Sequence, residues 1–233
     1  MQKIIGFGIL SFVKIFSHLF YRGEFKWITS APERPWDHAK LMVFLNHTSL
    51  FEPLFIQQLS FSFLWKLVAR ANVPGADITL NRPLVGRFWK LMFPNISSVT
   101  RKKDHSWDNY LKSIRPDSLI LIAPEGRMKR TSGLDKFGKP MTVKGGVADI
   151  LENINEGAMI LCLSGGLHHV QAPGQHFPRP FKTIRMNFAF FDIKDYKSQF
   201  QSLSPRERKI KITQDMQAHL EKNCPIDPAT SKK

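Results

Sequence analysis

After residue 35 the chain alternates between short apolar runs and longer amphipathic stretches. Continuous apolar runs at Leu41–Leu45, Leu119–Ala123 and Met159–Leu163 predict strands that are buried on both faces of a sheet. Apolar residues at every second position from Ile184 to Phe190 predict a further strand with one buried face. These four segments are the predicted strands, and a further strand end is expected at Ser97–Arg101.

Amphipathic helical patterns lie between and after these strands. They are found near Ser49–Leu59, Leu84–Phe93, Ser106–Ile114 and Val147–Ile154. A C-terminal helix is marked most clearly, because Ser204, Pro205 and Glu207 form a capping-box start and Pro225 follows its end. The alternation of strands and helices predicts an α/β fold with a mixed, largely parallel sheet flanked by helices.

Residues 4–20 form a separate amphipathic stretch at the N-terminus. On a helix, Ser11, Lys14 and His18 form a narrow polar stripe beside a broad apolar face, which comprises Ile4, Ile5, Ile9, Phe12, Ile15, Phe16 and Leu19. The cations Lys3, Arg22 and Lys26 flank it. We interpret the stretch as a membrane-interface helix, while the same periodicity also fits a core helix packed on the domain. This predicts two parts: residues 1–35 as helix and connector, and residues 36–233 as one α/β domain.

Composition narrows the possible partners. The 233 residues include 34 Lys and Arg against 19 Asp and Glu, a formal charge of +15, so we expect an anionic partner. The two cysteines favour a reducing compartment. No groove-reading motif accompanies the charge, so a nucleic-acid-binding protein is the weaker alternative. The chain lacks G-x-S-x-G, which disfavours a serine hydrolase, and its histidines show no metal-ligand spacing, so no metal is expected.

A histidine and an acid follow the first predicted strand. His47 comes just after Leu45, and Glu52 follows five residues later. A loop turn can bring the Glu52 carboxylate to one ring nitrogen of His47, leaving the other nitrogen to take a proton from an alcohol. Taken alone, this spacing is also common in surface or capping pairs.

Cations gather after two other predicted strand ends. One run reads Pro124-Glu125-Gly126-Arg127, followed by Lys129 and Arg130, and the other ends at Arg101. A glycine turn lets backbone amides approach a phosphate, and arginines supply charge-assisted donors. The sequence therefore predicts a base-like pair and two phosphate-sized sites at one edge of the sheet. The alternative interpretation of such a run is a solvated basic loop without a ligand.

Taken together, these blocks resemble the glycerolipid acyltransferases typified by 1-acylglycerol-3-phosphate acyltransferase, over roughly residues 40 to 165. The resemblance rests on Asn46-His47-Thr48-Ser49 with Glu52, on Arg101, and on Pro124-Glu125-Gly126. Lys144-Gly145-Gly146 and the apolar run Met159–Leu163 fall where that family has its later blocks. Three of the blocks depart from the family pattern. Glu52 replaces the usual Asp, Met128 holds the usual Arg position, and Cys162 and Leu163 stand where a proline is usual.

The resemblance implies an O-acyltransferase in which His47, supported by Glu52, deprotonates an acceptor hydroxyl. Acyl-CoA or an acyl carrier protein would be the acyl donor, a lysophospholipid the acceptor, and no cofactor would be needed. Asn46, Arg101, Glu125, Gly126 and Arg127 would form the substrate-binding set, with Glu125 bonding the glycerol hydroxyl or bracing the loop. The implied location is the cytoplasmic face of an anionic membrane, peripheral or monotopic. A catalytically inactive lipid-binding relative is the main alternative.

Overall fold

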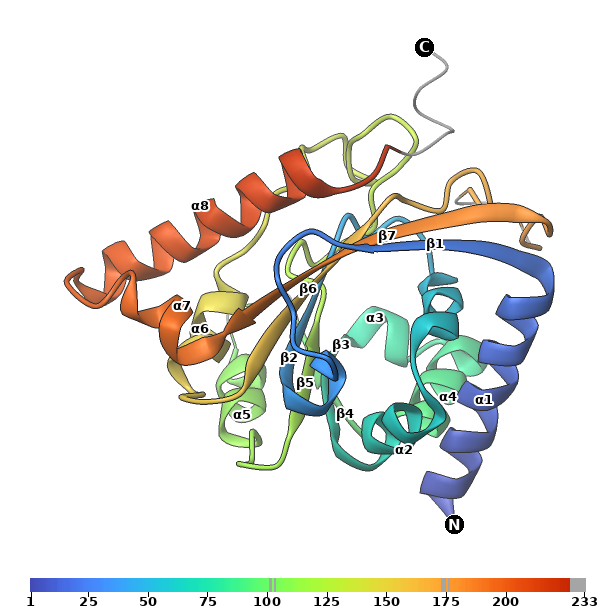
Figure 1. Cartoon of the computed structure of the whole chain (residues 1–233), viewed down its shortest axis with the longest axis horizontal. Helices are drawn as coiled ribbons and strands as arrows, with labels where there is room; N and C mark the ends of the chain where they lie inside the picture. The colour runs from blue at the N-terminus through green and yellow to red at the C-terminus, as the bar shows by residue number, and fades with distance from the viewer. Residues whose placement is uncertain (101, 103, 173–174, 176, 227–233) are drawn as a thin grey trace.

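A seven-stranded mixed sheet runs through the centre of the molecule in the order β1-β7-β6-β2-β5-β3-β4 (Figure 1). The computed structural model describes residues 1–226 except 101, 103, 173, 174 and 176. The strands are β1 (Tyr21–Trp27), β2 (Ala39–Leu45), β3 (Ala71–Ala76), β4 (Asn95–Val99), β5 (Leu119–Ile122), β6 (Ala158–Ser164) and β7 (Lys182–Asp192). Within this part of the chain, β6 and β7 pair antiparallel and the other neighbours pair parallel. The predicted α/β class with a mixed, largely parallel sheet is confirmed.

Helices cover both faces of the sheet. One layer holds α1 (Gln2–Phe20), the 3-10 helix η2 (Glu52–Gln58), α2 (Phe61–Arg70) and α4 (Pro83–Met92). The other holds α5 (Ser106–Lys112), α6 (Gly146–Glu152), α7 (Ile193–Ser198) and α8 (Pro205–Asn223). Two short elements, η1 (Pro35–His38) and α3 (Asp77–Leu80), serve as connectors. Figure 1 shows the two layers on opposite sides of the sheet, with α8 and α1 far apart.

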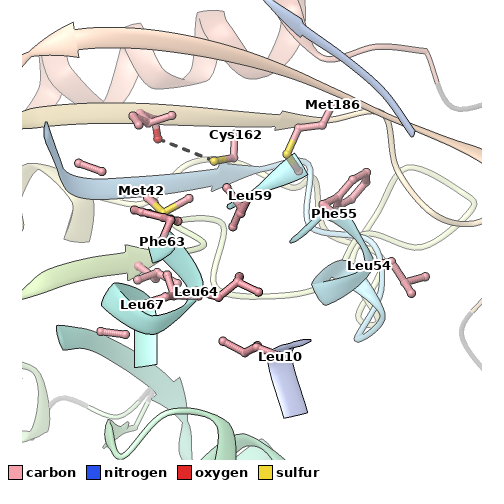
Figure 2. Close-up of a cluster of buried hydrophobic side chains, with 14 of the residues drawn as sticks. Leu10, Met42, Leu54, Phe55, Leu59, Phe63, Leu64, Leu67, Cys162 and Met186 are labelled. Carbon is pink, nitrogen blue, oxygen red and sulfur yellow. Dashed lines mark hydrogen bonds between the residues drawn. The ribbon is translucent and has the colours of Figure 1, made fainter. Parts of the chain in front are cut away.

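Two apolar cores form because the central strands bury both of their faces. Along β2, Met42 points into the core beneath α1 and α2, whereas Leu41, Val43 and Leu45 point into the core beneath α5, α6 and α8. Figure 2 shows the first of these cores, in which Leu10 of α1 joins the α2 leucines beneath the central strands.

The N-terminal helix packs on the domain with one side and exposes apolar residues on the other. Gly6, Leu10 and Ser17 are buried. At Gly6 the backbone of α1 comes so near the end of α4 that an added Cβ would lie 3.0 Å from two α4 carbonyl oxygens. The exposed apolar residues are Ile4, Ile5, Phe12, Ile15 and Leu19. Lys14, predicted to lie in a narrow polar stripe with Ser11 and His18, turns its ammonium towards the domain and donates to the Gln57 carbonyl at 2.5 Å.

Most predicted elements are present, and the exceptions have structural reasons. The predicted helix over 49–59 is a 3-10 helix that begins only at Glu52. The capping box at Ser204 and Glu207 is confirmed. β1 and β3 were not predicted, and β1 extends the sheet into the segment 1–35, where it pairs with β7. β1 alternates charged residues with apolar residues or glycine from Tyr21 to Trp27, whereas β3 has no such alternation and depends on its neighbouring strands.

The packing of α1 predicts unequal effects of the same substitution on its two sides. Leu10→Ala removes a side chain that is 1% exposed, and we expect a loss of about 2–5 kcal/mol in the free energy of unfolding. Leu19→Ala, at a side chain that is 69% exposed, should change it by less than about 0.5 kcal/mol. Urea unfolding followed by circular dichroism measures both variants. Equal effects would contradict the observed orientation of α1.

Candidate active site

The carboxyl ends of three neighbouring parallel strands, β5, β2 and β6, meet at one edge of the sheet. β2 ends at Leu45, and Asn46 then adopts a left-handed backbone conformation with a φ of 65°. Asparagine tolerates this conformation better than most residues do. The Asn46 side-chain amide donates to the Ser164 carbonyl at the end of β6 at 2.8 Å. Asn46, predicted to bind substrate, is thus a buried brace that turns the chain towards His47.

The predicted pairing of His47 with Glu52 is present in the structure. His47 Nδ1 lies 2.7 Å from Glu52 Oε2, and the second carboxylate oxygen accepts the Thr48 backbone N–H at 2.9 Å. The His47 side chain is 21% exposed and that of Glu52 is 15% exposed. A carboxylate at Nδ1 favours the tautomer whose proton lies on that nitrogen, which leaves Nε2 able to accept a proton.

Glu125 follows β5 and lies directly behind His47. Its two carboxylate oxygens accept the backbone N–H groups of Asn46 and His47, each at 2.9 Å. The residue is only 3% exposed. Of the two roles considered for Glu125, the geometry matches the bracing of the loop. Both oxygens are engaged by protein amides, and Glu125 does not line the cavity described below.

The two carboxylates set the charge state of His47. Burial by itself would lower the pKa of His47, but the charge and hydrogen bond of Glu52, with the charge of Glu125, raise it above its ordinary value of 6.5. Burial raises the pKa of Glu125 in turn, opposed by the two amides and by His47. The imidazolium is therefore stabilised, as a base that must take up a proton during a reaction requires.

The loop after Gly126 carries the predicted phosphate-binding cations. Gly126 has a φ of 68°, a conformation suited to glycine. Arg127 forms an ion pair with the buried carboxylate of Asp135 and stacks on the Phe137 ring at 4.7 Å. Its charge is thus partly neutralised by Asp135, a partner that the sequence analysis did not identify.

Lys129 contacts the loop that carries Asn46 and His47. Its ammonium lies 3.4 Å from Asn46 Oδ1, and its backbone N–H donates to the His47 carbonyl at 2.8 Å. His168 Nε2 in turn lies 2.8 Å from the Lys129 carbonyl. This region therefore links the ends of β2 and β5 to the turn after β6. Arg101 lies outside the described residues.

A cavity of about 380 Å³ opens beside His47 and Glu52. Its polar part includes four cations, Arg82, Arg127, Arg130 and Lys136. Its remaining wall is mostly apolar, made of side chains from the sheet and from the layer of α1, η2, α2 and α4. Arg82 and Lys136 were not foreseen, because neither belongs to a motif, and only their spatial approach to the cavity marks them. Among the described residues, no group of three or more His, Cys, Asp or Glu side chains is arranged to hold a metal ion.

The fold is similar to that of a solved lipid-modifying enzyme. No protein-family model matches the chain, and no curated protein matches it in sequence. The structure is similar to the crystal structure of the 1-acyl-sn-glycerophosphate (LPA) acyltransferase PlsC from Thermotoga maritima. The TM-score is 0.52 at 15% sequence identity, with 92% of this chain and 81% of the other covered. The two chains share a fold.

The charge arrangement at His47 predicts a specific titration. The imidazole should titrate with a midpoint above 6.5, and Glu52→Gln should shift that midpoint downwards, because it removes the negative charge that favours the imidazolium. NMR of the histidine ring protons measures this directly. Glu221→Gln, on the exposed side of α8, is the control and should leave His47 unchanged. An unaltered midpoint in Glu52→Gln would contradict the assigned pair.

Proposed function

We propose that this protein is an O-acyltransferase that moves a fatty acyl group from a thioester to a hydroxyl of a phosphate-bearing lysolipid, such as 1-acylglycerol-3-phosphate. The observation that carries the proposal is the hydrogen bond between His47 Nδ1 and Glu52 Oε2, 2.7 Å long, beside an apolar cavity with cations in its polar part. The likeness in fold to PlsC, itself described as a 1-acyl-sn-glycerophosphate acyltransferase, supports the same reaction class.

The chemistry needs one base and no covalent enzyme intermediate. His47 Nε2 takes the proton of the acceptor hydroxyl while its oxygen attacks the thioester carbonyl carbon. Collapse of the tetrahedral intermediate expels the thiolate, which receives the proton back from His47. Glu52 keeps the ring in the required tautomer and stabilises the imidazolium between these two proton transfers. The donor in this proposal is acyl-CoA or an acylated carrier protein, and no cofactor takes part.

The cavity has room for the two unlike ends of such substrates. Its volume of about 380 Å³ lies within the roughly 300–1,000 Å³ of small-molecule sites. The apolar wall suits an acyl chain, because burying each methylene contributes about 0.8 kcal/mol. Arg82, Arg130 and Lys136 suit an acceptor phosphate. Arg127 is less suited to bind the phosphate than its position beside Gly126 suggested, because its guanidinium already pairs with Asp135.

Substitutions at the pair test the reaction. His47→Ala should abolish acyl transfer, and Glu52→Gln should lower kcat by about 10²–10⁴-fold, the range of acid–base support. Glu52→Asp should retain more activity than Glu52→Gln, because it keeps the carboxylate charge. The measurement is thioester-dependent release of free CoA thiol with lysophosphatidic acid present. Near wild-type turnover by His47→Ala would exclude this residue as the base.

The same assay separates the alternatives. Binding of lysolipid without thiol release, across a panel of lysolipid and glycolipid acceptors, would indicate a catalytically inactive lipid-binding protein. Salt-sensitive binding to nucleic acid at affinities above that for vesicles would instead favour a nucleic-acid-binding protein.

The acceptor phosphate gives a second test. Arg130→Ala should raise the KM for lysophosphatidic acid by roughly tenfold or more, because a hydrogen bond to a charged group contributes about 1.5–3 kcal/mol. The KM for the acyl donor should change little. Monoacylglycerol, which lacks the phosphate, serves as the control acceptor and should be insensitive to the substitution. Equal changes for both acceptors would indicate a structural role for Arg130.

We further propose that the exposed side of α1 lies on an anionic membrane at its cytoplasmic face. By length and composition α1 could cross a bilayer. Its buried side instead packs on η2, α2 and α4, so the proposal is an interfacial helix. Exposed apolar residues of the neighbouring helices extend the surface, namely Phe61 and Trp65 of α2 and Leu84, Phe88 and Leu91 of α4. Lys3, Arg22 and Lys26 supply nearby charge.

Point substitutions test this surface better than deletion of residues 1–26, which would also remove Leu10 and most of β1. The double variant Phe12→Ser/Leu19→Ser should bind anionic vesicles at least about tenfold more weakly, because burying each side chain contributes about 1.5–3 kcal/mol. Liposome flotation measures the bound fraction. Ile210→Ser, at an exposed position on α8 across the molecule, is the control (Figure 1). Full flotation of the double variant would place the membrane contact elsewhere.

A further inference from the structure

Two polar side chains of α1, Lys14 and Ser17, face the protein and bind one short element. Ser17 is fully buried, and its hydroxyl donates to the Leu54 carbonyl at 2.6 Å. Gln57 Nε2 donates to the same hydroxyl at 3.1 Å, and Lys14 donates to the Gln57 carbonyl at 2.5 Å. All of these partners belong to η2.

η2 carries Glu52 as its first residue. A 3-10 helix has poorer hydrogen-bond geometry than an α-helix and usually extends over only three or four residues. η2 has seven residues and Pro53 near its start, which has no N–H to donate. Its position therefore depends on contacts with neighbouring elements. The bond from Ser17 reaches η2 at Leu54, only two residues beyond Glu52.

We propose that Ser17 and Lys14 are positioning residues that hold Glu52 against His47, which makes the N-terminal helix a part of the catalytic apparatus as well as a membrane contact. The expected effect on turnover rests on the proposed function. The expected effect on the His47–Glu52 contact does not depend on that function. The outward side of α1 has a separate role, because Phe12 and Leu19 make no contribution to this network.

The chain offers a closely matched pair of substitutions. Ser17→Ala removes the hydroxyl that joins Leu54 to Gln57. Ser11→Ala makes the same change six residues earlier in the same helix, at a buried hydroxyl without a hydrogen-bond partner among the described residues. Lys14→Met removes the other link and serves where Ser17→Ala does not fold.

NMR titration of His47 is the deciding measurement, since it needs neither substrate nor turnover. The ionisable groups that face His47 are Glu52 from η2 and Glu125 from the loop after β5, and all three variants retain both. If η2 loosens, Glu52 moves away and the titration midpoint of His47 falls. We expect this fall in Ser17→Ala or Lys14→Met and none in Ser11→Ala.

Steady-state kinetics provide the second measurement. In Ser17→Ala, kcat should fall by about tenfold or more, since misplacement of a catalytic group by about 1 Å can cost roughly 10²-fold. The KM for either substrate should change little. The loss should persist with a short-chain, water-soluble acceptor and no vesicles, where Phe12→Ser/Leu19→Ser should turn over as the wild type does.

The outcomes separate the two proposals. A His47 midpoint that is unchanged in Ser17→Ala and Lys14→Met, or that falls equally in Ser11→Ala, overturns the positioning role. A selective fall supports it, even if no tested acceptor is acylated, in which case only the proposed reaction fails.

Discussion

The buried carboxylate of Glu125 is the constraint on which the rest of the site depends. It brings a charge to the ends of β5 and β2, where an unpaired ionised group would cost several kcal/mol. The cost is offset because both oxygens accept backbone N–H groups, from Asn46 and His47, and because His47 carries a compensating charge when protonated. Removing the carboxylate would leave two buried amides unpaired at a left-handed turn. The direction of the His47 side chain, and so its contact with Glu52, depends on that turn.

The sequence predicted the central strands because burial on both faces leaves a continuous apolar run. β2, β5 and β6 are of this kind, and their predicted positions agree with the structure to within a residue or two. β1 and β3 lack this pattern. β1 alternates charged and apolar residues at an edge of the sheet, and β3 contains Pro74 and Gly75. The alternation in β1 is a strand pattern that the prediction missed, whereas the pairing of β3 is decided by neighbouring strands. The same limit applies to η2, whose helical period was visible while its 3-10 geometry was not.

Within the site, the contacts that span a few residues were predictable and those that span a loop were not. His47 and Glu52 are five residues apart, so a single turn brings them together. Whether Glu125 faces substrate or backbone depends on the turn at Asn46, 79 residues away along the chain. The pairing of Arg127 with Asp135 likewise depends on how the loop after Gly126 folds. Residue type and spacing suggested the chemistry of these groups, but the fold decides which atoms they contact.

The N-terminal helix shows why periodicity could not decide between lipid and protein as its partner. A helix at a membrane interface usually turns its polar side chains to water, yet Lys14 and Ser17 point into the domain. They do so because the carbonyls of Leu54 and Gln57 in η2 present acceptors that an apolar face would leave unsatisfied. Lys14 and Ser17 thereby bond inside the protein, whereas His18 stays exposed beside the exposed apolar residues Phe12, Ile15 and Leu19. Exposure of this outward side to water is unfavourable, because burying apolar surface would stabilise the protein by roughly 25 cal/mol for every Å² covered. The two sides of α1 thus differ: the inward side meets hydrogen-bond acceptors of η2, and the outward side exposes mainly apolar side chains.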